Sequence, residues 1–293
     1  LLTLKGTRTT IAGPGLPVFA NMLGLIPKVE VLYKGSAVFS MSGADAMASG
    51  MLVCGFESWG LNWVGAAAEE VSFTFLISLG RVLYDPKECF PRSTRGELIL
   101  QITYESGAFT GFTTVKAQIE TVELPDASPE QYLRMTTLSF TPSVAGEHDI
   151  ELPIGNPISE LVLYGEIFPL ADDDDASLGY LQILIDNYRR FYSHTEFETA
   201  HNMAGRMRCP PGYWRGHVHW NPGAGALGDV QWPGNHLLED YVHLPFDIFR
   251  DGRYALDTAG KSDVILRVNV DTLAHDKKIR VIPCEIVPSG KGF

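Results

Sequence analysis

The sequence predicts an all-β protein built from two similar β-sandwich domains, and three observations lead to this prediction. Short apolar runs alternate along the chain with turn-forming glycine and proline, of which the 293 residues contain 29 and 18. Many of these runs alternate apolar with polar residues, as antiparallel strands with one solvated face do. Two stretches of the chain also resemble each other, which indicates a duplicated domain.

Alternation is clearest in the run 112–123, where Val115, Ala117 and Ile119 are separated by polar residues. Helical segments are expected only at Gly43–Met51 and Glu196–Met203, with one further turn at Pro129–Tyr132. No alternation of strands with helices of crossover length is present, which argues against a parallel sheet. The expected strands are Val29–Tyr33, Val71–Ile77, Glu97–Tyr104, Phe112–Glu123, Leu133–Phe140, Glu147–Leu152, Glu160–Tyr164, Leu181–Ile185, Trp214–Trp220, Tyr241–Leu244, Asp263–Val270 and Lys278–Val287.

The internal repeat is seen when Val29–Met51 is placed above Leu181–Met203 without a gap. Both segments predict a strand, a polar turn, a second short strand and a short helix. Farther on, Glu97–Thr103 (ELILQIT) resembles Asp263–Asn269 (DVILRVN) position by position. The two alignments have different offsets, as expected for a duplicated domain with a longer loop in its second copy. Identical residues in the first alignment are Leu32 and Leu184, Phe39 and Phe191, Ala48 and Ala200, and Met51 and Met203.

The repeat predicts three parts of the chain. Residues 1–19, rich in Gly, Pro and Thr, are expected to form an N-terminal arm. Residues 20–165 form the first sandwich and residues 166–293 the second, and the acidic run Asp172–Asp175 lies in the stretch that joins them.

Composition narrows the function. The apolar share of 45% and charged share of 20% are those of a folded globular protein. A net charge of −12 argues against a protein whose main surface binds nucleic acid, because phosphate binding needs a cationic face. No run approaches the roughly 18 apolar residues that a membrane-spanning helix requires.

Candidate metal sites are weak. His217 and His219 would lie on one face of a strand, a spacing that occurs in metal sites. A metal site of this kind also needs a nearby Glu and a later His, and His236 and His243 lie in no recognisable register. Asp172–Asp175 lacks the alternating spacing and turn glycine of a calcium loop, which favours a solvated linker. We therefore expect surface or interface histidines, no metal ligands and no cofactor.

Catalytic motifs are also lacking. The sequence contains no G-x-S-x-G elbow and no phosphate-binding G-x-x-x-x-G-K-[ST] loop. Gly223–Gly228 matches G-x-G-x-x-G, but it leads into Asp229 and Trp232 instead of a helix, so we interpret it as a loop. No catalytic residue is assigned, and we expect a structural protein rather than an enzyme. The four cysteines form no C-x-x-C pair, which favours buried reduced thiols: Cys54, Cys89, Cys209 and Cys284.

An aromatic-rich segment leaves one alternative open. Tyr213, Trp214, Trp220 and Trp232 lie close together in the sequence. Such rings bind sugars in many sandwich domains, which would make this a carbohydrate-binding protein or a glycan-active enzyme. The competing interpretation is that they cover the end of a barrel or a subunit contact, where Trp and Tyr are favoured.

Three passages resemble a known family: Lys28–Gly43, Leu138–Tyr164 and Tyr254–Val270. Their order of strands, turns and helix is similar to that of the double jelly-roll major capsid proteins of tailless icosahedral, membrane-containing bacteriophages. The resemblance implies that each half is a jelly roll, a sandwich of two antiparallel sheets.

The same resemblance implies a role. Three subunits would form a homotrimer with a pseudo-hexagonal outline, and such trimers would tile an icosahedral shell in the virion after synthesis in the host cytoplasm. Implied partners are the chain itself, neighbouring trimers, minor capsid proteins and an internal membrane reached by the N-terminal arm, with no specific nucleic acid. A minor capsid or spike protein is a further alternative, because these also use β-sandwiches.

Overall fold

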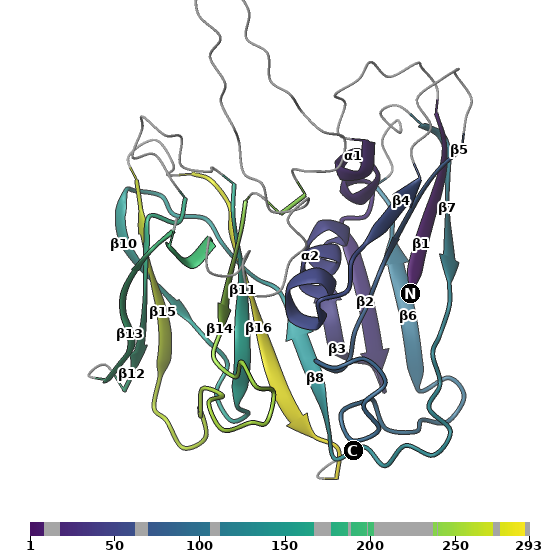
Figure 1. The fold of residues 1–293 in the computed structure, drawn as a ribbon. Coiled ribbons are helices and arrows are strands. Elements are labelled where there is room, and N and C mark those ends of the chain that lie inside the picture. The colour runs from purple at the N-terminus through teal and green to yellow at the C-terminus, as the bar shows by residue number, and fades with distance from the viewer. Residues whose placement is uncertain are drawn as a thin grey trace, which may run out of the picture.

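A computed structural model describes residues 1–8, 18–61, 70–105, 112–166, 177–186, 189–197, 199–201, 237–238, 240–271 and 276–290. Two β-sandwiches lie side by side in this structure (Figure 1). Each sandwich has its own cluster of buried apolar side chains. No helix among the described residues is long and apolar enough to cross a membrane.

The first sandwich consists of two antiparallel sheets. One has the strand order β4-β5-β1-β7, and the other contributes the order β3-β2-β6. Every second side chain of β5 belongs to the core of this sandwich. Val71, Phe73 and Phe75 point inward and are buried, while the residues between them face out. The strands are β1 (Leu2–Arg8), β2 (Lys28–Tyr33), β3 (Ser36–Met41), β4 (Trp59–Leu61), β5 (Glu70–Phe75), β6 (Leu98–Thr103) and β7 (Phe112–Ile119).

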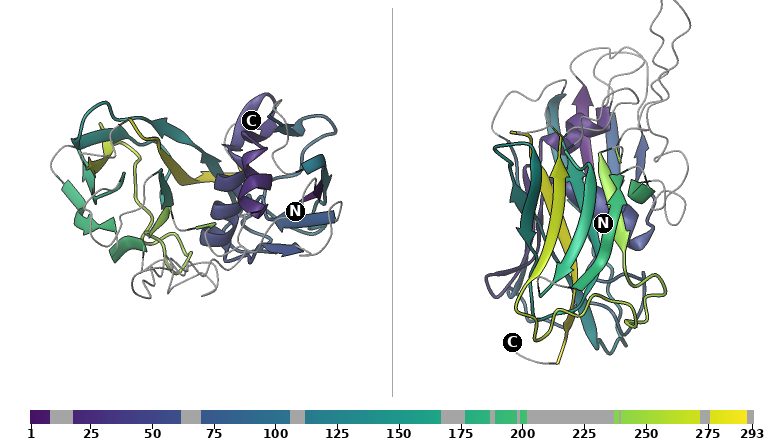
Figure 2. Two further views of the ribbon diagram at one scale, coloured as in Figure 1. Left: turned by 90° about the horizontal axis from the view of Figure 1, so that it is seen from above. Right: turned by 90° about the vertical axis from the view of Figure 1, so that its left-hand side faces the viewer.

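Two helices belong to the first sandwich, α1 (Val18–Gly24) and α2 (Gly43–Cys54). The Ser42 hydroxyl accepts the Asp45 amide hydrogen and so caps α2 at its start. Gly55 ends the helix in the left-handed conformation (φ 69°), which glycine adopts without strain. Seen from above, these dark purple helices lie between the two sandwiches (Figure 2).

The second sandwich has the sheets β10-β15-β12-β13 and β14-β11-β16. In β15 every second side chain is buried, as the sequence pattern predicts for a strand with one solvated face. In β11 both faces are buried, because its outer face is covered by the first sandwich. The strands are β10 (Gly146–Glu151), β11 (Ile158–Gly165), β12 (Tyr180–Ile185), β13 (Arg189–Glu196), β14 (Tyr241–Pro245), β15 (Val264–Val270) and β16 (Ile279–Pro288).

One strand joins the two sandwiches. β8 (Gln131–Thr136) pairs antiparallel with β16 of the second sandwich and parallel with β3 of the first. The short strand β9 (Leu138–Phe140) continues the pairing along β16. A single hydrogen-bonded sheet of eight strands therefore runs through both halves of the molecule.

The strand pairings confirm the predicted duplication. The sequence repeat aligns Leu32 with Leu184 and Ile99 with Ile265, and these residues pair as Leu32 with Ile99 and Leu184 with Ile265. Both hairpins also carry a register shift at the same repeat position, after Val31 in one copy and after Ile183, its counterpart, in the other.

The turns of the two hairpins match as well. Lys34 and its repeat counterpart Asp186 have positive φ values of 48° and 50°. The Lys34 amide donates to the Glu97 carbonyl at 2.9 Å, and the Asp186 amide donates to that of Asp263, the counterpart of Glu97, at 3.1 Å. Register, bulge and turn agree in both copies, and chance similarity of apolar strands would not produce this agreement.

The equivalence extends to the order of three strands in each sheet. The order β5-β1-β7 corresponds to β14-β11-β16, and β3-β2-β6 corresponds to β13-β12-β15. The expected helix after β13 begins at Phe197, equivalent to α2, and His201 is its last described residue. The expected helix at Gly43–Met51 is confirmed as α2. The helical turn expected at Pro129–Tyr132 is wrong, because Gln131 and Tyr132 belong to β8.

Two expected boundaries differ from the observed pairing. Residues 1–19 do not form an arm throughout, because β1 lies between β5 and β7 with Leu2 and Leu4 fully buried. The expected first domain, 20–165, includes β11, yet β11 pairs with β14 and β16 and so opens the second sandwich. In both cases pairing with strands far along the chain decides the assignment, and local sequence patterns do not report it.

Candidate functional site: the buried junction between the sandwiches

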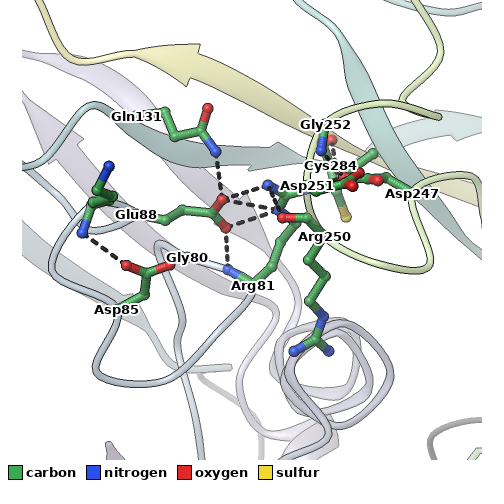
Figure 3. A network of polar contacts seen from close by, with 12 residues as sticks. Gly80, Arg81, Asp85, Glu88, Gln131, Asp247, Arg250, Asp251, Gly252 and Cys284 are labelled. Atoms are coloured by element: carbon green, nitrogen blue, oxygen red, sulfur yellow. Dashed lines mark hydrogen bonds and ion pairs between the residues drawn. The ribbon is translucent and has the colours of Figure 1, made fainter.

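The feature that distinguishes the described part of the molecule is a set of buried charges between the two sandwiches. Arg81 lies in the segment after β5 and is only 1% exposed. Its guanidinium donates to Glu88 of the same segment, with Nη2 to Oε2 at 2.6 Å and Nε to Oε1 at 2.9 Å. Its Nη1 reaches Asp247 of the second sandwich at 2.5 Å. One cation thus joins a carboxylate from each half of the chain (Figure 3).

Local structure holds Glu88 in place for this contact. The Arg81 amide donates to Glu88 Oε1 at 2.6 Å, and Gln131 Nε2 donates to Oε2 at 2.7 Å. Gly80 lets the chain approach closely, because a Cβ there would lie 2.2 Å from the Glu88 carbonyl oxygen. Burial alone would raise the pKa of Glu88, but the hydrogen bonds and charge of Arg81 outweigh it and lower the pKa. Glu88 is therefore a buried carboxylate held in its ionised form.

The loop after β14 completes the contact from the other side. Gly252 donates its amide hydrogen to Asp247 Oδ2 at 2.7 Å, which orients the carboxylate toward Arg81. Arg250 extends back to the first sandwich and donates from Nη2 to the Val53 carbonyl at 2.6 Å, near the end of α2. Arg81 of the first sandwich thus binds a carboxylate of the second, and Arg250 of the second binds a backbone carbonyl of the first.

A second group of charges joins the start of α2 to β16. Arg280 donates to both carboxylate oxygens of Asp45, from Nε to Oδ2 and from Nη2 to Oδ1 at 2.8 Å each. The Tyr241 hydroxyl donates to Asp45 Oδ1 at 2.7 Å, and burial is the main cause that raises the pKa of Tyr241. The guanidinium also stacks over the Tyr164 ring, 3.5 Å from its centroid. Asp45 belongs to the first sandwich, whereas its partners Arg280 and Tyr241 belong to the second.

Two further pairs lie beside these. Glu160 of β11 and His243 of β14 meet at 2.6 Å, and both side chains are at most 3% exposed. Arg134 of β8 forms a bidentate pair with Glu285 of β16 at 2.9 and 2.6 Å. Apolar side chains from the outer face of the β11–β16 layer complete the junction and join the core of the first sandwich: Val162, Ile282, Cys284 and Ile286.

The ion pairs at the junction fix the position of one sandwich relative to the other. Charged groups removed from water must find partners, and a bidentate pair is satisfied at only one relative position of the two halves. Because the partners come from different sandwiches, the pairs and the shared sheet set the angle between the sandwiches. Glu88 and Asp247 form ion pairs with Arg81, and Asp45 forms one with Arg280, as carboxylates with a structural role do.

The residues that the sequence singled out do not gather here. His217 and His219, Asp172–Asp175, Gly223–Gly228 and the aromatic cluster lie outside the described residues. His243 lies in the junction as a partner of Glu160. Cys54, Cys89 and Cys284 are free thiols, while Cys209 is not among the described residues. Across the described ranges, no group of three His, Cys, Asp or Glu side chains is placed to hold a metal ion.

Sequence reasoning missed the junction charges. Arg81 and Asp247 are 166 residues apart, and Asp45 and Arg280 are 235 apart, so no local spacing relates them. The available signal was weak: a charged residue placed within an otherwise apolar strand, such as Glu160 in β11.

Comparison with known proteins concerns the fold. A scan of protein-family models and a search of curated proteins find no match to the sequence. The crystal structure of major capsid protein P2 from bacteriophage PM2 matches with a TM-score of 0.51 and 11% identity, covering 100% of this chain and 89% of that one. The PBCV-1 virus capsid matches at 0.54 and 12%, covering 99% and 87%.

A third solved structure is similar in fold to this chain. The atomic structure of Sulfolobus turreted icosahedral virus gives a TM-score of 0.59 and 9% identity, covering 98% of this chain and 82% of that one. At such identities the agreement is one of architecture. The chain has the double jelly-roll fold of these capsid structures, and the fold class predicted from the sequence is confirmed.

Proposed function

We propose that this chain is a viral major capsid protein whose copies form trimers of pseudo-hexagonal outline, and that these trimers tile an icosahedral shell. The observation that carries the proposal is the duplicated jelly roll, matched over nearly the whole chain by viral capsid structures. The internal repeat in register supports it independently, because a chain with two equivalent sandwiches lets a threefold assembly approximate six equal positions.

The junction supports the same role. A trimer imitates a hexagon only if the two sandwiches of each chain keep a constant angle, and a hinged pair would give irregular trimers. The shared eight-stranded sheet resists bending, and the pairs Arg81–Asp247 and Asp45–Arg280 oppose sliding. Such a role needs a rigid body with specific surfaces and requires no catalytic group.

The observed pairings suggest a revised division of the chain. We take the first jelly roll as β1 to β7, the second as β11 to β16, and residues 131–151 as the connection that contributes β8 to β10. The partners that follow are further copies of the chain, neighbouring trimers and minor capsid proteins in the virion. Contact with an internal membrane would have to use a segment other than β1, which is an inner strand of its sheet.

Molar mass in solution tests the proposal. The purified protein, with a subunit mass of 32.2 kDa, is examined by light scattering after size-exclusion chromatography at micromolar concentration. The expected particle has three times that mass and appears as a six-lobed disc by negative-stain electron microscopy. A stable monomer that forms no larger assembly contradicts the proposal, and binding to a glycan panel would favour the carbohydrate alternative instead.

A further inference from the structure

The contact between the two sandwiches joins unlike faces of equivalent units. The α2 side of the first sandwich lies against the outer face of the β14-β11-β16 layer of the second. Within one chain this uses one face of each sandwich. Each sandwich has a second face, equivalent to the one its partner uses, that takes no part in this contact. On the first sandwich it is the outer face of β5-β1-β7, and on the second it is the side where β13 leads into the helix at Phe197. A head-to-tail contact of this kind can be repeated from copy to copy.

The remaining sheet face is polar and carries a like-charge pair. Lys5 of β1 and Lys116 of β7 are directly opposed in the register. Like charges at opposed positions of antiparallel strands repel each other. Within the described part of the chain neither lysine forms an ion pair, although Glu70 lies on the same layer opposite Thr7. Thr, Ser and Gln side chains occupy the rest of this face: Thr3, Ser72, Thr74, Thr114 and Gln118.

On the equivalent face of the second sandwich, a cationic side chain forms an ion pair with the first sandwich. There Arg280 of β16, the strand equivalent to β7, binds Asp45 in the first turn of α2. The contact therefore consists of a cation on the last strand of the layer and an acid at the start of the helix.

The second sandwich carries an acid at the corresponding helix start. The repeat alignment places Phe197 at the position of Asp45, and Glu196 comes directly before it at the end of β13. The Glu196 side chain is 55% exposed and contacts His194, at 2.5 Å, on its own strand. The position of Asp45 itself is taken by the buried Phe197, and the exposed carboxylate of Glu196 lies one residue before it.

From these placements we propose that Glu196 of one copy binds the Lys5–Lys116 pair of a second copy, so that the chains associate head to tail. This inference rests on the proposed function, because it names the contact by which the copies would assemble. The interface repeats the arrangement of the intrachain junction with polar groups in place of apolar ones, which suits a contact formed after folding. Electrostatic complementarity at such a contact sets the partner and the register.

Charge reversal tests the pairing. K116E sets an acid against Glu196, and E196K sets a lysine against the lysine pair, so each variant should weaken association by about tenfold or more at low salt. The double variant K116E/E196K exchanges the charges and should recover most of the lost affinity. Added salt should reduce the difference between the single variants and the unchanged protein.

The measurement is the concentration at which the oligomer dissociates, followed by light scattering, with thermal melting to verify that each variant folds. K87E provides the matched control, because Lys87 is 69% exposed and pairs with Glu130 in another part of the molecule. If the unchanged protein is monomeric, the proposed function fails together with this inference. If it assembles but both reversals behave as K87E does, or the double variant shows no recovery, this contact is wrong and the capsid proposal stands.

Discussion

Replacement of Arg81 by alanine should strongly destabilise the protein. The substitution removes five hydrogen bonds made by the guanidinium, four to carboxylate oxygens of Glu88 and Asp247 and one to the Arg250 carbonyl. It leaves two carboxylates that are 5% and 0% exposed without their cation. Gln131 and two backbone amides would still donate to them, so the loss is partial.

The magnitude follows from the cost of breaking a buried pair. Removing one partner of a buried ion pair costs about 3–5 kcal/mol, most of it from the unpaired charge left behind. A chain of 293 residues has an unfolding entropy near 0.6 kcal/mol/K at about 2.1 cal/mol/K per residue. The midpoint of thermal unfolding should therefore fall by about 5–8 °C.

Scanning calorimetry of the purified subunit measures this change, with urea unfolding as a second probe. Arg253→Ala is the control, because Arg253 is 79% exposed and pairs with Asp251 at the surface, so its midpoint should move by no more than about 1 °C. If Arg81→Ala melts with the control, the two sandwiches do not depend on this cation and the junction argument is refuted.

Three further predictions concern the same region. Gly50→Ala in α2 should lower stability by about 1–3 kcal/mol, because the added Cβ would lie 2.6 Å from a neighbouring carbonyl, whereas Gly24→Ala, with open space, should not; equal urea midpoints for the two variants would contradict the packing. Burial raises the pKa of Cys54 to about 12, so iodoacetamide at pH 8 should label Cys89 before Cys54, as peptide mass spectrometry would show. The lowered pKa of Glu88 adds stability that is fully present above its ordinary value of 4.5 and is lost as the pH falls through the folded pKa. Unfolding free energies from pH 7 to 3 should therefore decline less steeply in Glu88→Gln, and identical slopes would contradict the shift.

Local patterns in the sequence were sufficient for most of the strands and for the duplication, although they missed β1 and β4. Alternation placed Val264–Val270 within one residue of the expected Asp263–Val270, and it placed the start of Phe112–Ile119, although the expected strand ran on to Glu123. The repeat fixed the counterpart of Leu32 as Leu184, and the register of the neighbouring strands agrees. These are properties of short segments, which a sequence displays directly.

Features that depend on distant segments were not accessible in this way. Leu2–Arg8 alternates through only two apolar residues, Leu2 and Leu4, and it precedes a Gly, Pro and Thr-rich stretch, so pairing with β5 and β7 is what identifies it as an inner strand. A strand was correctly expected at Glu160–Tyr164, within β11, but it was assigned to the wrong sandwich, because its partners lie about 80 and 120 residues farther along the chain. The pairs Arg81–Asp247 and Asp45–Arg280 have the same origin, since their partners come from different sandwiches.

The outer faces of the two equivalent sheets differ in polarity. In the second copy the outer face of the sheet is apolar, with Ile282 and Ile286 buried against the first sandwich. Apolar contact alone would let the layers slide over each other, whereas the bidentate Asp45–Arg280 pair is satisfied at one position. In the first copy the equivalent face carries hydroxyls and lysines, which keep it solvated until a partner arrives. The contact within the chain is therefore apolar with buried charges, and the contact that we propose between chains is polar, which suits a subunit that folds before it assembles.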